Sequence, residues 1–189
     1  HFTGGIRPVR MASFIAHVVT CGVDNGLDCD GTDALVGGNI SMRSHQNAAR
    51  SLNSNAIATG ERNGHTAHVM IARNIIFDCD HALLLKEGAT AVLQNNTIVR
   101  IRDGASSSQP GAAINFQEAN INTDPGGGAV LDGNIIWDLN GYPFTLNYDA
   151  AESYLQVRRT IIEDLLFPGD GNSQADRMLA RPERWGKGR

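Results

Sequence analysis

The chain has 189 residues, a length typical of one domain, and a formal net charge of -4 at pH 7. It lacks the basic footprint that nucleic-acid binding requires, so no nucleic-acid partner is expected. No apolar run approaches the roughly 20 residues of a membrane span, so no span is expected either. Three cysteines, an odd number, predict no disulfide framework.

A short phrase, Asn followed by two or three mostly aliphatic residues, recurs along the chain. It begins at Asn39, Asn74, Asn96 and Asn134, with a degenerate copy at Thr160. The spacings are 35, 22, 38 and 26 residues. Repeats of this length are typical of solenoids, because one repeat cannot bury its apolar face alone and must stack on its neighbours. Asn tolerates left-handed backbone at a corner, and its amide both donates and accepts, so we expect a structural ladder of stacked asparagines.

Each repeat divides into three strand-like segments: one after the Asn, one of period two, and one before the next Asn. In the second segment, alternation places Leu85 and Phe116 in the core and Lys86, Asn115 and Gln117 outside. The third segment is apolar on both faces, which predicts that a loop, another domain or a partner covers its outer side. The sequence therefore predicts an all-β fold, a right-handed single-stranded parallel β-helix of about five coils with three strands per coil.

The expected domain organisation is a parallel β-helix over residues 1–167 and a C-terminal tail over residues 168–189. The strand pattern begins almost at once, near Phe14. A solenoid needs a terminal cap, so we expect the N-terminal cap to be missing and other domains of the same chain to be partners.

Residues 24–33, 77–88 and 95–99 resemble right-handed parallel β-helix repeat proteins of the pectate-lyase-like superfamily, in particular the secreted bacterial members found in large surface proteins. Residues 169–177 are similar to a Gly-x-Gly-Asn…Ala-Asp-Pro segment that often follows the last coil, with Arg177 in place of Pro. The resemblance covers about residues 13 to 180. It implies the fold and an extracellular or cell-surface location, but no single chemistry, because the superfamily holds lyases, hydrolases, epimerases and adhesins.

The densest acidic cluster consists of Asp24, Asp28, Asp30 and Asp33. Oxygen-rich clusters suit Ca²⁺, so Asp28, Asp30 and Asp33 are candidate metal ligands. In the resembled lyases Ca²⁺ holds an acidic sugar. Asp28 and Asp30 could also act as acid and base in glycoside hydrolysis. The alternative is that these carboxylates cap turns and solubilise the outer face.

Lys86 is a candidate catalytic base, because the register places it two coils from Asp30 with Gly60 between them. A lysine near carboxylates and bound Ca²⁺ could abstract the C5 proton of a sugar, which is the lyase reaction. The alternative is an exposed ion pair with Glu87 of little energetic consequence.

Two long loops, at about residues 41–55 and 101–112, would wall a groove along the second strands. His45, Arg50 and Arg102 are candidate ligands for the carboxylates of an acidic polysaccharide, since arginine binds carboxylates bidentately. Asn115 and Gln117 would form the floor of this groove. The alternative is solvated loop charge.

Two functions follow from these patterns. The first, which the sequence favours, is a non-catalytic extracellular module of a larger secreted or surface protein that contacts glycans or neighbouring domains. It is favoured because no catalytic motif is complete and aromatic residues make up only 6% of the chain. The second is a Ca²⁺-assisted polysaccharide lyase, or a hydrolase, acting on an acidic polysaccharide at the outer face of the second strands.

Overall fold

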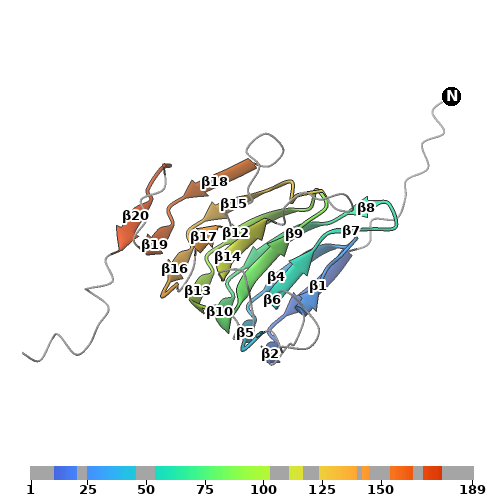
Figure 1. Cartoon of the computed structure of the whole chain (residues 1–189), viewed down its shortest axis with the longest axis horizontal. Helices are drawn as coiled ribbons and strands as arrows, with labels where there is room; N and C mark the ends of the chain where they lie inside the picture. The colour runs from blue at the N-terminus through green and yellow to red at the C-terminus, as the bar shows by residue number, and fades with distance from the viewer. Residues whose placement is uncertain are drawn as a thin grey trace, which may run out of the picture.

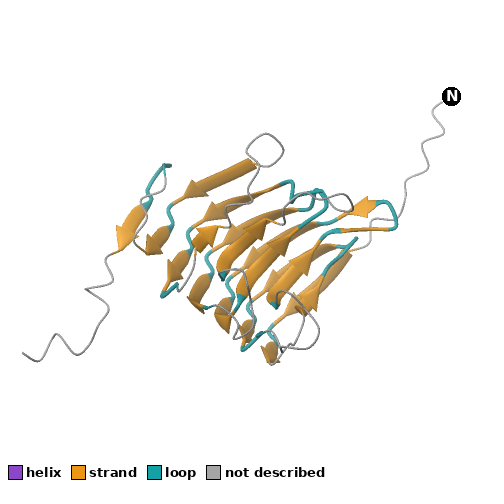
Figure 2. Ribbon diagram, viewed as in Figure 1, coloured by secondary structure: helices purple, strands orange, loops and turns teal. Residues whose placement is uncertain are grey.

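The computed structural model describes residues 11–20, 25–45, 54–102, 111–116, 124–139, 142–144, 154–163 and 168–175. These residues form strands and turns, with no helix among them (Figure 2). The described ranges thus offer no helix that could cross a membrane.

The strands form three parallel sheets, and in each sheet the strands follow one another along the molecule (Figure 1). We name them by their place in the repeat. The anchor sheet holds the strands that follow the recurring Asn, the middle sheet holds the period-two strands, and the return sheet holds the strands that precede the next Asn.

Within each sheet, the strands lie side by side in the order of the repeats along the chain. The return sheet contains β1 (Met11–Ile15), β4 (Asp33–Gly37), β9 (His68–Ala72), β12 (Thr90–Gln94), β15 (Gly128–Asp132) and β18 (Tyr154–Arg158). The anchor sheet contains β2 (Val18–Thr20), β5 (Ile40–Met42), β10 (Ile75–Cys79), β13 (Thr97–Ile101), β16 (Ile135–Trp137), β19 (Ile161–Glu163) and β20 (Ser173–Ala175). The middle sheet contains β3 (Asn25–Asp28), β6 (Asn55–Thr59), β11 (His81–Leu85), β14 (Ala112–Phe116) and β17 (Tyr142–Phe144). A small antiparallel hairpin, β7 (Glu61–Arg62) and β8 (His65–Thr66), leaves the solenoid between β6 and β9.

This arrangement confirms the predicted all-β parallel solenoid. Each strand pairs in parallel with the equivalent strand of the next repeat, as in Leu83 with Ile57 on one side and Ile114 on the other. From β1 to β19, leaving the β7–β8 hairpin aside, consecutive strands lie in different sheets, so the chain winds from return to anchor to middle sheet and back. The right-handed sense of the coil stays a prediction.

The core is a stack of aliphatic side chains from all three sheets. Leu85, Ile114 and Phe116 are fully buried members of this core, as the period-two pattern predicts. Cys29 and Cys79 lie in the same cluster as free thiols, and burial is the main cause that raises the pKa of each to about 11. Both thiols are therefore protonated members of the core at neutral pH.

The asparagine ladder runs through the corner between the return and anchor sheets. Asn74 donates both its backbone N–H and its Nδ2 to Asn96 Oδ1, at 2.9 Å each. Asn96 does the same to Asn134 Oδ1, at 2.9 and 3.0 Å, and Asn39 does so to Asn74. Each Nδ2 also reaches a buried backbone carbonyl, as from Asn96 to Ile71 at 2.8 Å. Stacked corners therefore satisfy one another's buried polar groups, as the repeat predicts.

The left-handed residue of this corner is the one before the recurring Asn. Gly38, Arg73, Asn95 and Gly133 have φ of 65°, 56°, 54° and 70°. The expectation that the ladder asparagines themselves adopt the left-handed conformation was wrong. Their side chains are fixed by the ladder, so the turn is made one residue earlier, at positions that include two glycines.

The ladder continues beyond the last predicted copy. Asn134 donates its backbone N–H to Thr160 Oγ1 at 3.3 Å, and Thr160 donates its own N–H to Asn172 Oδ1 at 3.0 Å. β20 pairs with β19 directly after Asn172. Residues 168–175 thus stack on the solenoid.

The outer face of the return sheet carries an exposed apolar file on its central strands, and the end strands β1 and β18 expose further apolar residues such as Met11 and Tyr154. Met70 and Val92 are 42% and 41% exposed. The described residues therefore leave Met70 and Val92 without the cover that was predicted over these strands.

Candidate functional site

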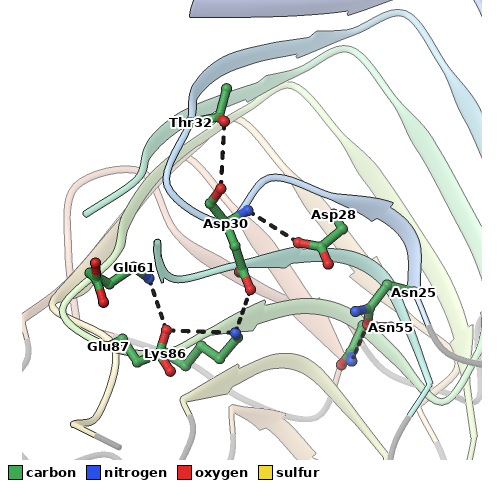
Figure 3. Close-up of polar contacts among 8 residues, drawn as sticks. All are labelled: Asn25, Asp28, Asp30, Thr32, Asn55, Glu61, Lys86 and Glu87. Carbon is green, nitrogen blue, oxygen red and sulfur yellow. Dashed lines mark hydrogen bonds and ion pairs between the residues drawn. The ribbon is translucent and has the colours of Figure 1, made fainter. Parts of the chain in front are cut away.

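The structure brings Lys86 and Asp30 together at the corner between the middle and return sheets. Lys86 Nζ lies 2.6 Å from Asp30 Oδ2 and 3.6 Å from Glu87 Oε2 (Figure 3). Asp28 lies beside them and accepts the backbone N–H of Asp30 on Oδ1 at 3.1 Å. We call Asp28, Asp30, Lys86 and Glu87 the lysine cluster.

The cluster spans three coils because the coil in the middle presents Gly60. A Cβ on Gly60 would lie 2.6 Å from Glu87 Oε2 and 3.0 Å from both Asp30 Oδ1 and Lys86 Cε. The missing side chain therefore leaves the space that the ion pair occupies. This is the register predicted from the sequence, with Gly60 between Asp30 and Lys86.

Glu87 makes hydrogen bonds to two other segments of the chain, one through its side chain and one through its backbone. Its Oε2 accepts the backbone N–H of Glu61 at 2.9 Å, which fastens the start of the β7–β8 hairpin (Figure 3). Its own N–H donates to the carbonyl of Asp124 at 2.7 Å. The cluster thus ties the hairpin and the segment around Asp124 to one corner.

The electrostatics of the cluster follow from its composition, since three carboxylates share one ammonium. Burial lowers the pKa of Lys86, but its hydrogen bond to Asp30 and the charges of Asp30, Glu87 and Asp28 outweigh burial, so the net pKa is raised. Burial, aided by the charges of Asp28 and Glu87, raises the pKa of Asp30 despite the lysine. Lys86 is therefore a charged ammonium at neutral pH.

The third predicted metal ligand, Asp33, has other partners. It opens β4 on the return sheet, where its Oδ1 accepts the backbone N–H of His68 at 2.9 Å and lies 3.3 Å from His65 Nε2. Across the described ranges, no group of three or more His, Cys, Asp or Glu side chains is placed to hold a metal ion. Asp24 lies outside the described residues.

His45 and Arg102 lie at the opposite end of the middle sheet, at its corner with the anchor sheet. His45 Nδ1 is 2.8 Å from the buried Asp80 Oδ1, and its Nε2 is 3.5 Å from Asp78 Oδ1. Arg102 Nη2 is 3.9 Å from Asp138 Oδ2. One five-residue strand, roughly 15 Å long, separates this corner from the lysine cluster. The candidate residues therefore form two groups, each already paired with carboxylates of this chain.

The middle of the predicted groove floor is covered. Ala58 is fully buried, and Asn115 is 4% exposed although it alternates with the core residues Ile114 and Phe116. Arg50 and Gln117 lie outside the described residues, as do 46–53 and 103–110 of the two predicted loops. The parts of the predicted groove that solvent reaches are therefore its two ends, the lysine cluster and the corner of His45 and Arg102.

A second polar row was not predicted from the sequence. Asn25, Asn55 and His81 are the first residues of three neighbouring middle strands and pair in register. Asn55 Nδ2 donates to Asn25 Oδ1 at 2.9 Å, and the buried His81 accepts the N–H of Ala112 on Nδ1 at 3.0 Å. The signal was present in the sequence, because each residue stands two positions before an inward aliphatic residue of its strand.

No protein-family model, curated protein or solved structure matches this chain.

Proposed function

We propose that the chain is a non-catalytic β-helical module of a larger secreted or surface protein, of the kind found in the pectate-lyase-like superfamily. The observation that carries the proposal is the state of Lys86. Its ammonium is bound to Asp30 at 2.6 Å, and its pKa is raised by its hydrogen bond to Asp30 and by the surrounding carboxylates. A base must offer a free lone pair near the operating pH, and this lysine offers an ion pair that ties neighbouring coils together.

A rigid spacer is the role that the rest of the fold supports. The solenoid buries its polar corners in side-chain ladders and fills its interior with aliphatic side chains. Stacking of this kind gives each coil its stability through its neighbours. Such a module holds the domains of a longer protein at a fixed distance.

Glycan contact belongs to the same proposal and is assigned to the corner of His45 and Arg102. Arg102 is half-exposed, and its contact to Asp138 is long at 3.9 Å, so a sugar carboxylate can replace it. Binding of polyuronates would be measured by titration with oligogalacturonate. We expect Arg102→Ala to weaken binding while Arg158→Ala, an exposed arginine on the return sheet, leaves it unchanged. Equal effects of both variants would show charge attraction without a site.

The polysaccharide lyase is the second candidate, favoured by the gathering of Lys86, Asp28 and Asp30 at one corner. A lyase forms an unsaturated product that absorbs in the ultraviolet. The test is incubation of the protein with pectate, alginate and chondroitin, with and without Ca²⁺. We expect no product from the wild type. A product that is lost in Lys86→Ala would establish the lyase and overturn the non-catalytic module.

A further inference from the structure

The outer face of the anchor sheet carries an apolar stripe two residues wide, interrupted in its second row by the polar Thr97 of β13. Met42, Phe77, Val99 and Trp137 pair in register as one row, and each is half-buried. Ile75 and Ile135 belong to the neighbouring row and are 44% and 41% exposed. We call these six residues the outer stripe. By contrast, the apolar file on the return sheet is one residue wide.

A file of alternating charge borders the outer stripe. Each residue of the row Met42, Phe77, Val99 and Trp137 is followed in the sequence by a charged residue, in the order Arg43, Asp78, Arg100 and Asp138 along the solenoid. All four have left-handed backbone, with φ of 61°, 58°, 58° and 55°, so they occupy equivalent corners. Arg100 Nε lies 3.5 Å from Asp138 Oδ2, with these side chains 56% and 53% exposed. Exposed pairs of this kind are weak and can exchange partners.

The order of these charges is self-complementary under reversal. A two-fold axis along the strands, between β10 and β13, turns a second copy so that its solenoid runs in the opposite direction. Arg43 then faces Asp138 of the copy, and Asp78 faces Arg100, so every contact joins opposite charges. The same operation sets Phe77 against Val99 and Met42 against Trp137, and thereby covers the stripe on both copies.

We propose that the outer stripe and its charged file form an antiparallel homodimer interface. Two copies with solenoids running in the same direction, and with their files in contact, would set like charges against each other and are disfavoured. The stripe spans four coils, roughly 15 Å at about 4.8 Å per coil. An interface of this size is at the small end for specific contacts, so the dimer dissociates on dilution.

The test is sedimentation equilibrium of the purified chain from micromolar to millimolar concentration, at low and high salt. We expect a monomer–dimer equilibrium that weakens with salt, because the charged file is exposed. A wild type that stays monomeric throughout assigns the stripe to another occupant, such as a further domain of the same protein, and overturns the proposal.

Two double exchanges with the same composition and net charge discriminate this dimer from general stickiness. Arg100→Asp with Asp138→Arg sets Arg against Arg and Asp against Asp in the antiparallel dimer, and we expect it to weaken dimerisation roughly ten-fold or more. Asp78→Arg with Arg100→Asp preserves all four opposite-charge contacts and should keep the wild-type affinity. Equal behaviour of the two exchanges would contradict the assigned geometry.

A third variant keeps the test decisive if either exchange impairs folding. Ile75→Lys places a charge in the outer stripe at a position that is already 44% exposed in the single chain. We expect native circular dichroism and loss of the dimer. A dimer of unchanged affinity in Ile75→Lys would exclude the outer stripe from the interface.

Discussion

Two polar regions tie the coils together by different means, the asparagine ladder and the lysine cluster. The ladder is buried and uncharged, and the side-chain oxygens of Asn39, Asn74, Asn96 and Asn134 all accept hydrogen bonds from the coil before. The lysine cluster is partly exposed, joins four charges, and leaves the buried Asp30 Oδ1 without a hydrogen-bond partner among the described residues. The comparison teaches that the asparagine ladder, which recurs in successive coils, specifies the fold, whereas the lysine cluster, which occurs once, stabilises a single corner of it.

The largest expected effect comes from breaking the ladder. Asn96→Ala removes the acceptor of two donors of Asn74 and the donor to the buried carbonyl of Ile71. Buried polar groups left unpaired cost about 1–3 kcal/mol each, so we expect the free energy of unfolding to fall by roughly 3–5 kcal/mol. Urea denaturation measures it. The neighbouring Asn95→Gly, which keeps the left-handed turn outside the ladder, is the control and should change little.

Breaking the lysine cluster should have a smaller effect. Lys86→Gln removes the cation that Asp30 and Glu87 share, but both side chains keep access to solvent, at 17% and 26% exposure. We expect a loss of roughly 1–2 kcal/mol, between the values of exposed and buried ion pairs. A double-mutant cycle with Asp30→Asn isolates the pair, and additive losses would show that the two residues do not interact.

The space at Gly60 sharpens the comparison further. The Cβ of Gly60→Ala would lie 2.6 Å from Glu87 Oε2, at the movable end of a side chain. The cluster can yield, so we expect a loss of about 1 kcal/mol, comparable to one weakened ion pair. In the background of Lys86→Gln the same substitution should cost less, because Glu87 is then free of the ammonium and can move more easily away from the new Cβ. An equal loss in both backgrounds would place the strain in the backbone.

The smallest effect is the pH dependence of the cluster. Burial raises the pKa of Asp30 above 3.8, so the folded state holds this proton more tightly than the unfolded state. Its contribution to stability is therefore largest below pH 3.8 and falls as the pH rises through the folded-state pKa. Lys86, whose pKa is also raised, contributes stability below pH 10.5 that is lost as the pH rises through its folded-state pKa. Stability curves of wild type and Asp30→Asn should diverge over the acid window. Parallel curves would contradict the raised pKa of Asp30.

The features that the sequence predicted best follow its repeat. The ladder residues and the inward set around Phe116 follow a period, so one correct copy predicts the others. The register alone placed Lys86 two coils from Asp30, across Gly60. In contrast, Asp33 was predicted to join Asp28 and Asp30 because it has the same carboxylate. The turn after Asp30 places Asp33 beside His65 and His68 instead, and the sequence did not predict that turn.

Burial of the middle sheet's outer face was also beyond the sequence. Alternation gives the direction of a side chain such as Asn115, but not whether that face is buried in the folded chain. The same limit applied to the pairing of His45 with Asp80, because these residues meet only when two coils stack.

Native-state hydrogen exchange tests the central comparison most directly, because both regions hold backbone N–H groups on side-chain oxygens. Asn74 and Asn96 donate to the ladder, whereas Asp30 and Glu61 donate to carboxylates of the lysine cluster. We predict that Asn74 and Asn96 exchange only through global unfolding, with the full free energy of the solenoid, while Asp30 and Glu61 exchange through local opening at lower free energy. Equal protection in both regions, or faster exchange at Asn74 and Asn96, would contradict the ladder as the feature that holds the fold.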